Sequence, residues 1–221
     1  GHDLVNEWSL ISQEADGFIV RKSGKEVATV RWAFDSGVMG RHNQLNALAA
    51  IASAHHIGIS PEDSARALAE FKNVKRRLET VGTTNDITVY DDFAHHPTAI
   101  TTTVDGLRRR VGNARILAVL EPRSNTMKLG VMKAQLPTSL QQADKVFAFG
   151  AHAGKEALGW DLEEVLSPLN SVDQSKACAF DDLEGLVKAV IEEARPGDHV
   201  LVMSNGGFGG VHQKILKALA G

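Results

Sequence analysis

Four short apolar runs after residue 86 constrain the fold of this sequence more than any other feature. None alternates cleanly between apolar and polar residues; they are Ile87–Asp91, Ile116–Leu120, Val146–Phe149 and His199–Met203. Runs of this kind are typical of strands that are buried on both faces of a mostly parallel sheet. Stretches with helical character lie between and after them, at 97–110, around 132–143, at 183–194 and at 211–219. This alternation predicts a doubly wound α/β domain.

The first part of the chain predicts a smaller unit. Residues 17–34 contain two β-rich runs around a turn at 22–25, which predicts an antiparallel pair. The alanine-rich segment from Asn43 to Ile57 has the spacing of a helix. A second helix is expected to begin after Ser60 as the N-cap and to run to about Asn73. We place the domain boundary so that the domains are 1–78 and 79–221.

Composition excludes several classes of partner. The 221 residues carry 24 Lys and Arg against 27 Asp and Glu, a formal net charge of −3. This balance gives no long-range field for nucleic acid or anionic lipid, so we expect neither a nucleic-acid nor a membrane partner. No apolar run approaches the roughly 20 residues of a membrane span. The single cysteine, Cys178, favours a reducing compartment, and we expect a cytoplasmic protein.

A first polar cluster, Asp91–Pro97, follows one predicted strand and precedes a helix. It contains Asp91, Asp92, His95 and His96. In an open α/β sheet, ligands bind beyond the carboxyl ends of the strands, so these groups could hold a ribose, a phosphate or a metal. The alternative is a helix-capping loop, but four ionisable groups exceed what a cap requires.

A second cluster, Glu121–Lys128, follows the next strand. Arg123 could grip a carboxylate or phosphate with two parallel hydrogen bonds, and Ser124, Asn125 and Thr126 add neutral hydrogen-bonding groups. A solvated loop explains the same residues equally well.

A third cluster, Ser204–Gln213, contains four glycines in the five residues 206–210. Glycines let the backbone approach an anion and aim amides at it, with a helix N-terminus behind them. The spacing differs from the G-x-G-x-x-G pattern of a first βα unit, so a tight turn or a lid remains the alternative.

Two further positions fall in the first domain. Asn43 and Asn46 are three residues apart and therefore share one face of the first helix, where their amides could read a purine edge. Arg76 and Arg77 form a basic pair at the boundary. The sequence contains no G-x-x-x-x-G-K-[ST] phosphate loop, no H-E-x-x-H and no C-x-x-C pair, so no metal site is predicted in this chain.

Taken together, these segments resemble the Mur ligase family. The strings that carry the resemblance are Gly40–Ala50, Arg76-Arg77-Leu78-Glu79 and Tyr90–Thr98, in the order that the family has them. The resemblance implies that 79–221 is the C-terminal Rossmann-like domain of such a ligase. Residues 1–78 would then be the small antiparallel sheet and helices that end its central ATPase domain. The phosphate loop and the magnesium ligands of the family would lie upstream, in N-terminal domains of the same polypeptide. Since the chain also begins Gly-His rather than with Met, we expect a fragment that is inactive alone.

Within the family, segments 121–130 and 203–214 resemble members that accept a peptide. The implied reaction uses ATP and Mg²⁺ to join UDP-N-acetylmuramate to the murein tripeptide L-alanyl-γ-D-glutamyl-meso-diaminopimelate through an acyl phosphate, in peptidoglycan recycling. The resemblance implies nucleotide contacts by Asn43, Asn46, Arg77, Asp92 and His95. It implies peptide contacts by the other candidates, which are Arg123, Ser124, Asn125, Lys128, Asn205, Gly206, Gly207, Gly209 and His212.

Two alternatives stay open. The first is a fragment of the family member that adds free L-alanine to UDP-N-acetylmuramate, since it shares the Asp-Asp-aromatic-small-His-His-Pro-Thr pattern. The second is a stand-alone module that binds a nucleotide or peptide and performs no chemistry.

Overall fold

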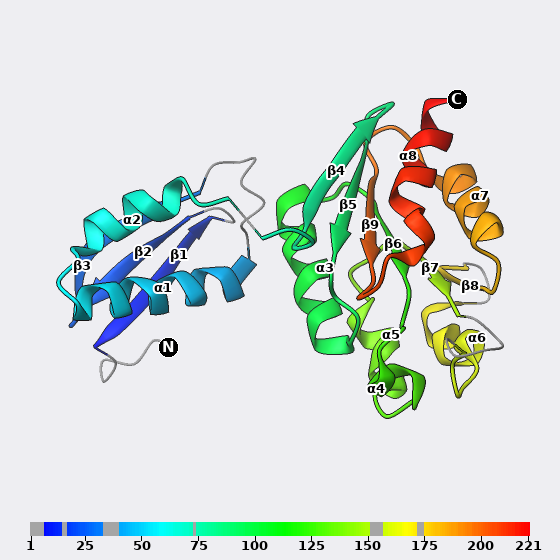
Figure 1. Ribbon diagram of the computed structural model, residues 1–221, viewed down its shortest axis with the longest axis horizontal. Coiled ribbons are helices and arrows are strands. Elements are labelled where there is room, and N and C mark those ends of the chain that lie inside the picture. The colour runs from blue at the N-terminus through cyan, green and yellow to red at the C-terminus, as the bar shows by residue number, and fades with distance from the viewer. Residues whose placement is uncertain (1–6, 15–16, 33–39, 73, 151–156, 172–174) are drawn as a thin grey trace. The chain divides into compact units, whose positions relative to one another are not determined.

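The computed structural model describes residues 7–14, 17–32, 40–72, 74–150, 157–171 and 175–221. The chain divides into two compact units, Gly1–Val74 and Lys75–Gly221. Each unit has its own sheet and its own apolar core, and Figure 1 labels their elements.

Unit 1 is a three-stranded antiparallel sheet with two helices. Its strands are β1 (Trp8–Glu14), β2 (Gly17–Lys22) and β3 (Lys25–Arg31), in that order. The expected pair around residues 22–25 is confirmed as β2 and β3, and β1 adds a strand that the sequence pattern missed. The core joins side chains of the sheet to others from the helices, among them Phe18, Val30 and Ile51.

The two helices of unit 1 are α1 (Gly40–His56) and α2 (Pro61–Ala69). The prediction of Ser60 as the N-cap is confirmed, because its hydroxyl accepts a hydrogen bond from Asp63 N at 3.0 Å. α2 ends at Ala69, four residues before the expected Asn73, and Glu70 is its C-cap.

Unit 2 confirms the expected α/β class. Its six-stranded sheet has the order β4-β5-β9-β6-β7-β8, with β4 antiparallel to β5 and every other pair parallel. The strands are β4 (Glu79–Thr84), β5 (Ile87–Asp92), β6 (Ile116–Leu120), β7 (Lys145–Phe149), β8 (Ala177–Phe180) and β9 (His199–Met203). The four apolar runs became β5, β6, β7 and β9. The sequence analysis missed β4, which carries no comparable run, and β8, whose four apolar residues Ala177–Phe180 it did not single out.

Helices cover both faces of this sheet. They are α3 (Pro97–Val111), α4 (Asn125–Lys128), α5 (Leu136–Ser139), α6 (Leu162–Leu166), α7 (Leu183–Glu193) and α8 (Val211–Ala220), with 3-10 turns η1 (Lys133–Gln135), η2 (Ser167–Leu169) and η3 (Phe208–Gly210). The single helix expected around 132–143 is replaced by η1 and α5. α7 and α8 lie side by side on one face (Figure 1), where Leu186 and Ile215 pack against Val119 and Val202. All five residues of β6 are buried, as a strand covered on both faces requires.

The order of strands brings three loops to one edge of the sheet. β9 lies between β5 and β6, and Met203 is in register with Asp92 on one side and with Leu120 on the other. The loops that follow these three strands therefore start beside one another. Those loops carry the three polar clusters of the sequence, at the kind of strand-order reversal where α/β proteins bind ligands.

The boundary between the two units lies between residues 74 and 75 of the chain, four residues before the predicted boundary of 78/79. Residues 75–78 group with unit 2. The physical reason is that Arg76 and Leu78 form hydrogen bonds to residues that end β5.

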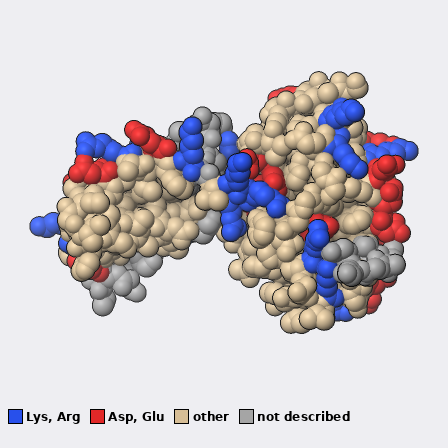
Figure 2. Space-filling view, in the orientation of Figure 1, with Lys and Arg blue, Asp and Glu red and all other residues tan. Residues whose placement is uncertain are grey.

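No helix among the described segments is both long enough and apolar enough to cross a bilayer. On the face drawn in Figure 2, basic and acidic side chains are interspersed, in keeping with the formal net charge of −3.

A half-buried histidine, His199, makes the stability of unit 2 sensitive to acid. Burial, together with the nearby charge of Arg110, holds the pKa of His199 below its usual value, and Nδ1 of its ring lies 3.0 Å from the Tyr90 hydroxyl. The unfolded chain therefore protonates His199 more readily than the folded chain does. The contribution of His199 to the stability of unit 2 is fully present above the unfolded pKa of about 6.5 and is lost as the pH falls below it.

We therefore expect the Tm to fall between about pH 7.5 and about pH 5.5, and to fall less in His199→Gln. Scanning calorimetry at the two pH values measures this. His56→Gln, at an exposed position on α1, is the matched control and should retain the full drop. The same drop in His199→Gln as in the wild type would contradict the assignment.

Candidate ligand site at the strand ends

A single guanidinium, that of Arg76, ties the ends of β5 and β9 together. Its Nε donates to Asp91 Oδ2 at 3.1 Å, and its Nη2 donates to the carbonyl oxygens of Ser204 at 2.6 Å and Gly206 at 2.9 Å. The guanidinium also lies over the Phe93 ring, 5.2 Å from its centroid. Arginine suits this position because its donors are held in a fixed fork.

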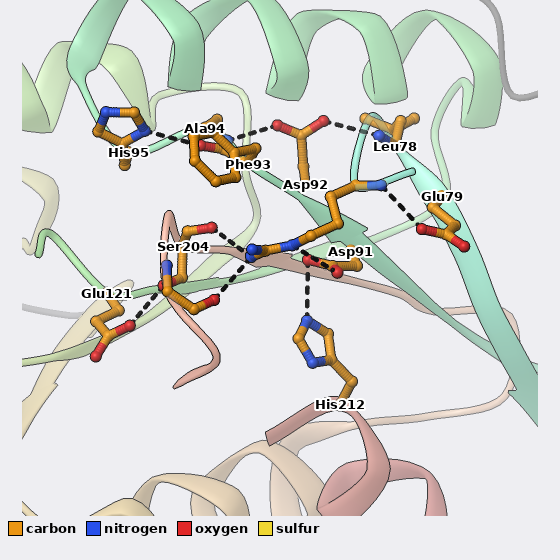
Figure 3. A network of polar contacts seen from close by, with 12 residues as sticks. Leu78, Glu79, Asp91, Asp92, Phe93, Ala94, His95, Glu121, Ser204 and His212 are labelled. Carbon is orange, nitrogen blue, oxygen red and sulfur yellow. Dashed lines mark hydrogen bonds and ion pairs between the residues drawn. The ribbon is translucent and has the colours of Figure 1, made fainter. Parts of the chain in front are cut away.

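Asp91 extends the network to the first turn of α8. His212 Nε2 lies 3.1 Å from Asp91 Oδ1 (Figure 3). Burial disfavours the charge of Asp91, but the contacts with His212 and Arg76 outweigh it and hold the pKa of this carboxyl below its usual value. His212, which the resemblance assigns to the peptide, thus has Nε2 turned toward Asp91.

Asp92 faces the interior instead. It is 3% exposed, and its carboxylate accepts hydrogen bonds from the amides of Leu78 at 2.8 Å and Ala94 at 2.7 Å (Figure 3) and from the Thr103 hydroxyl at 3.1 Å. Burial raises the pKa of Asp92, and these hydrogen bonds offset only part of that effect. In this structure Asp92 fixes the shape of two loops.

Two other residues from the implied nucleotide set lie next to these loops. His95 is half-buried, and its Nδ1 lies 2.8 Å from the Phe93 carbonyl oxygen (Figure 3). Its ring meets the rings of Phe93 and His96 edge-on, with centroids 5.4 Å and 5.1 Å away. Arg77 is exposed, and its positive charge favours ionisation of Asp92.

The glycine loop, residues 204–210, is held at its start by side chains. Ser204 Oγ donates to Glu121 Oε2 at 2.5 Å (Figure 3) and accepts from Gly206 N at 2.9 Å. Phe208, Gly209 and Gly210 all have positive φ, of 43°, 55° and 69°. The buried Phe208 ring, which packs against Phe149, holds this non-glycine residue in a conformation that costs about 1–3 kcal/mol.

The side chains of Arg123 and Leu183 lie close to the positions that a Cβ would take at Gly206 and Gly209. A Cβ at Gly206 would lie 2.3 Å from Arg123 Nη1, so the Arg123 guanidinium packs directly on the glycine loop. A Cβ at Gly209 would lie 2.5 Å from Leu183 Cδ2. Gly207 is exposed, and its carbonyl oxygen accepts a hydrogen bond from Gly210 N at 3.0 Å. Asn205 places a buried Oδ1 in the loop with no hydrogen-bond partner among the described residues.

The loop after β6 forms the adjacent side. Ser124 is the N-cap of α4 and accepts from Met127 N at 3.3 Å, while Asn125 is exposed and Lys128 is half-buried. Trp160 Nε1 donates to the Met127 carbonyl at 2.6 Å, and Gly159 N donates to the Lys128 carbonyl at 3.0 Å. These two bonds fix the turn that presents Lys128.

Asn43 and Asn46 lie on α1 of unit 1, half-buried and exposed respectively. They belong to a different unit from the strand-end loops. Within the part of the chain that the structure describes, no cluster of three or more His, Cys, Asp or Glu side chains could hold a metal ion.

Sequence reasoning named the loops and placed Arg76, Glu121 and Ser204 in its candidate segments, but it did not predict the contacts by which these three residues organise the loops. Glu121 and Ser204 directly follow buried strands, and that position is a signal that could have singled them out. The basic pair Arg76-Arg77 was noted in the sequence, but nothing local predicts that Arg76 binds Ser204 and Gly206, which are 128 and 130 residues away along the chain.

Comparison with known proteins identifies the class of protein to which this site belongs. The family model for the Mur ligase, glutamate ligase domain, matches residues 76–206. The chain therefore belongs to the Mur ligase family.

Individual relatives narrow the comparison. The chain is 48% identical over 217 residues to the UDP-N-acetylmuramate–L-alanyl-γ-D-glutamyl-meso-2,6-diaminoheptandioate ligase of Haemophilus influenzae, covering 97% of this chain and 45% of that protein. A UDP-N-acetylmuramate–L-alanine ligase of Methylobacterium nodulans is 36% identical over 169 residues, 76% of this chain and 36% of that protein. The crystal structure of a murein peptide ligase from Psychrobacter arcticus matches 98% of this chain and 45% of its own, at 38% identity and a TM-score of 0.69. The chain thus spans less than half the length of these proteins.

Proposed function

We propose that this chain is the part of an ATP-dependent ligase that grips the incoming peptide, in a reaction joining UDP-N-acetylmuramate to L-alanyl-γ-D-glutamyl-meso-diaminopimelate. The observation that carries the proposal is the packing of Arg123 on Gly206 at the ends of β6 and β9. It puts a cation and a glycine-rich backbone side by side, as recognition of a carboxylate requires. The 48% identity to the Haemophilus influenzae ligase supports the choice of peptide.

The peptide carries several carboxylates. We assign the binding of these carboxylates to the side chains of Arg123 and Lys128 and to backbone amides of the glycine loop, including those of Gly207 and Gly209. Ser124, Asn125 and the unpartnered Oδ1 of Asn205 would bind neutral peptide groups. His212 acts through Asp91 by holding the end of the loop.

We assign the nucleotide side to Asn43 and Asn46 for the adenine and to Arg77 and His95 for the phosphates or ribose. Asp92 would serve this side by orienting the amides of Leu78 and Ala94. When bound, ATP with Mg²⁺ would activate the muramate carboxylate, which is otherwise a poor acceptor for an amine. Because this chain contains no phosphate-loop pattern, we assign phosphoryl transfer and the metal to an N-terminal part of the ligase. We assign the whole reaction to the cytoplasm, which the single cysteine, Cys178, favours. We expect the 221-residue chain to bind peptide without ligating it.

A second candidate acceptor is free L-alanine, because the Methylobacterium nodulans L-alanine ligase also matches. The tripeptide and L-alanine differ in how far their carboxylates lie from the attacking amine, and therefore in where the site must place its cations. A tripeptide reaches Arg123 and Lys128 with its remote carboxylates, whereas a single amino acid has one carboxylate near the amine.

Isothermal titration of the chain with the tripeptide, L-alanine and ATP in parallel tests the proposal. We expect saturable heat with the tripeptide and none with L-alanine. A response to L-alanine without preference for the tripeptide would favour the second candidate. No response to the tripeptide up to millimolar concentration would contradict the placement of the peptide site in this chain.

A further inference from the structure

The first segment of unit 2, residues 75–79, has an unusual backbone. Arg76 and Leu78 have φ of 59° and 50°, in the left-handed region that costs non-glycine residues about 1–2 kcal/mol. Each is held there by a carboxylate, since Arg76 N donates to Glu79 Oε2 and Leu78 N donates to Asp92 Oδ2, both at 2.8 Å. We call this segment the junction.

Arg76 of the junction also contacts the glycine loop. The Arg76 carbonyl accepts a hydrogen bond from Phe93 N at 2.9 Å, while its guanidinium donates to Ser204 and Gly206. Through Asp91 it also connects to His212, just beyond the other end of the loop. Arg76 therefore contacts the first part of the glycine loop directly, and through Asp91 it is linked to His212, two residues beyond the loop.

We propose that Arg76 is a positioning residue that couples the conformation of the junction to the glycine loop. The guanidinium holds the carbonyls of Ser204 and Gly206 toward itself, and this fixes where the amides of the same two peptide groups, those of Asn205 and Gly207, point. A rotation of the junction backbone moves the Arg76 guanidinium away, breaks its hydrogen bonds to the two carbonyls and so frees those peptide groups to reorient. The consequence for peptide affinity rests on the proposed function, but the coupling itself does not.

Hydrogen exchange of the intact chain, followed residue by residue, tests the coupling. The amides of Ser204 and Gly206 are suitable probes because both are hydrogen-bonded, to the Asp92 carbonyl and to Ser204 Oγ. Glu79→Ala removes the acceptor that holds Arg76 N and leaves the guanidinium intact. We expect it to accelerate exchange at these two amides roughly tenfold, with β6 unaffected. Glu184→Ala, at an exposed position on α7, is the control and should change neither amide.

The decisive comparison repeats Glu79→Ala in an Arg76→Ala background. If Arg76 carries the coupling, Arg76→Ala alone accelerates exchange and Glu79→Ala then adds nothing. An unchanged glycine loop in Glu79→Ala, or an equal acceleration in both backgrounds, would overturn the proposal. Arg76→Lys keeps the charge but lacks the fork, and serves as the background if the alanine variant does not fold. A chain that binds no tripeptide would contradict the proposed function and leave the exchange result standing.

Discussion

Replacing Asp92 by alanine is expected to lower the free energy of unfolding of unit 2 by about 2–4 kcal/mol, because it leaves two buried amides without acceptors. Those amides, of Leu78 and Ala94, lie in the two loops that Asp92 joins, and the carboxylate is 3% exposed. Calorimetry of the chain at neutral pH measures the change. Asp105→Ala, at a half-buried position on α3, is the matched control and should cost under about 1 kcal/mol.

The pH dependence of this difference has a definite sign. Because burial raises the folded-state pKa of Asp92 above the unfolded value, its contribution is greatest below the unfolded pKa and declines as the pH rises through the folded pKa. The deficit of Asp92→Ala relative to the wild type should therefore grow as the pH is lowered from neutrality. A deficit that shrinks toward acid would show that the carboxylate is stabilised as a charge in the fold.

Arg123→Ala is expected to weaken tripeptide binding roughly 10- to 100-fold, the loss typical of one charge-assisted pair of hydrogen bonds. Arg123→Lys should recover part of the affinity, since it restores the charge without the fork. Titration calorimetry on the three chains measures both effects, with Arg109→Ala, at an exposed position on α3, as the charge-matched control.

Gly206→Ala provides an independent check on the same contact. The added Cβ would lie 2.3 Å from Arg123 Nη1, so the guanidinium must move although its chemistry is unchanged. We expect weakened binding here as well, with little change in stability. Wild-type affinity in both Arg123→Ala and Gly206→Ala would place the carboxylate contact elsewhere on the strand-end loops.

Local features of the fold followed from the sequence because they depend on neighbours along the chain. The apolar run Ile116–Leu120 predicted a strand covered on both faces, and all five residues are buried. Ser60 was identified as an N-cap from the three residues after it, and its hydroxyl accepts from Asp63 N. β4 was not predicted, because an edge strand that is paired on one side only needs no continuous apolar run.

Four of the buried strands and the polar clusters that follow them could be predicted from the amino-acid order, because both depend on the hydrophobicity and spacing of adjacent residues. The position of β9 between β5 and β6, which brings the three clusters together, could be known only from the folded sheet. The tertiary structure also decided that Asp92 turns inward, that His212 pairs with Asp91 and that Arg76 binds a loop 128 residues away. These contacts join groups far apart in sequence, and nothing in the local pattern specifies which distant partner the folded sheet will place within hydrogen-bonding distance.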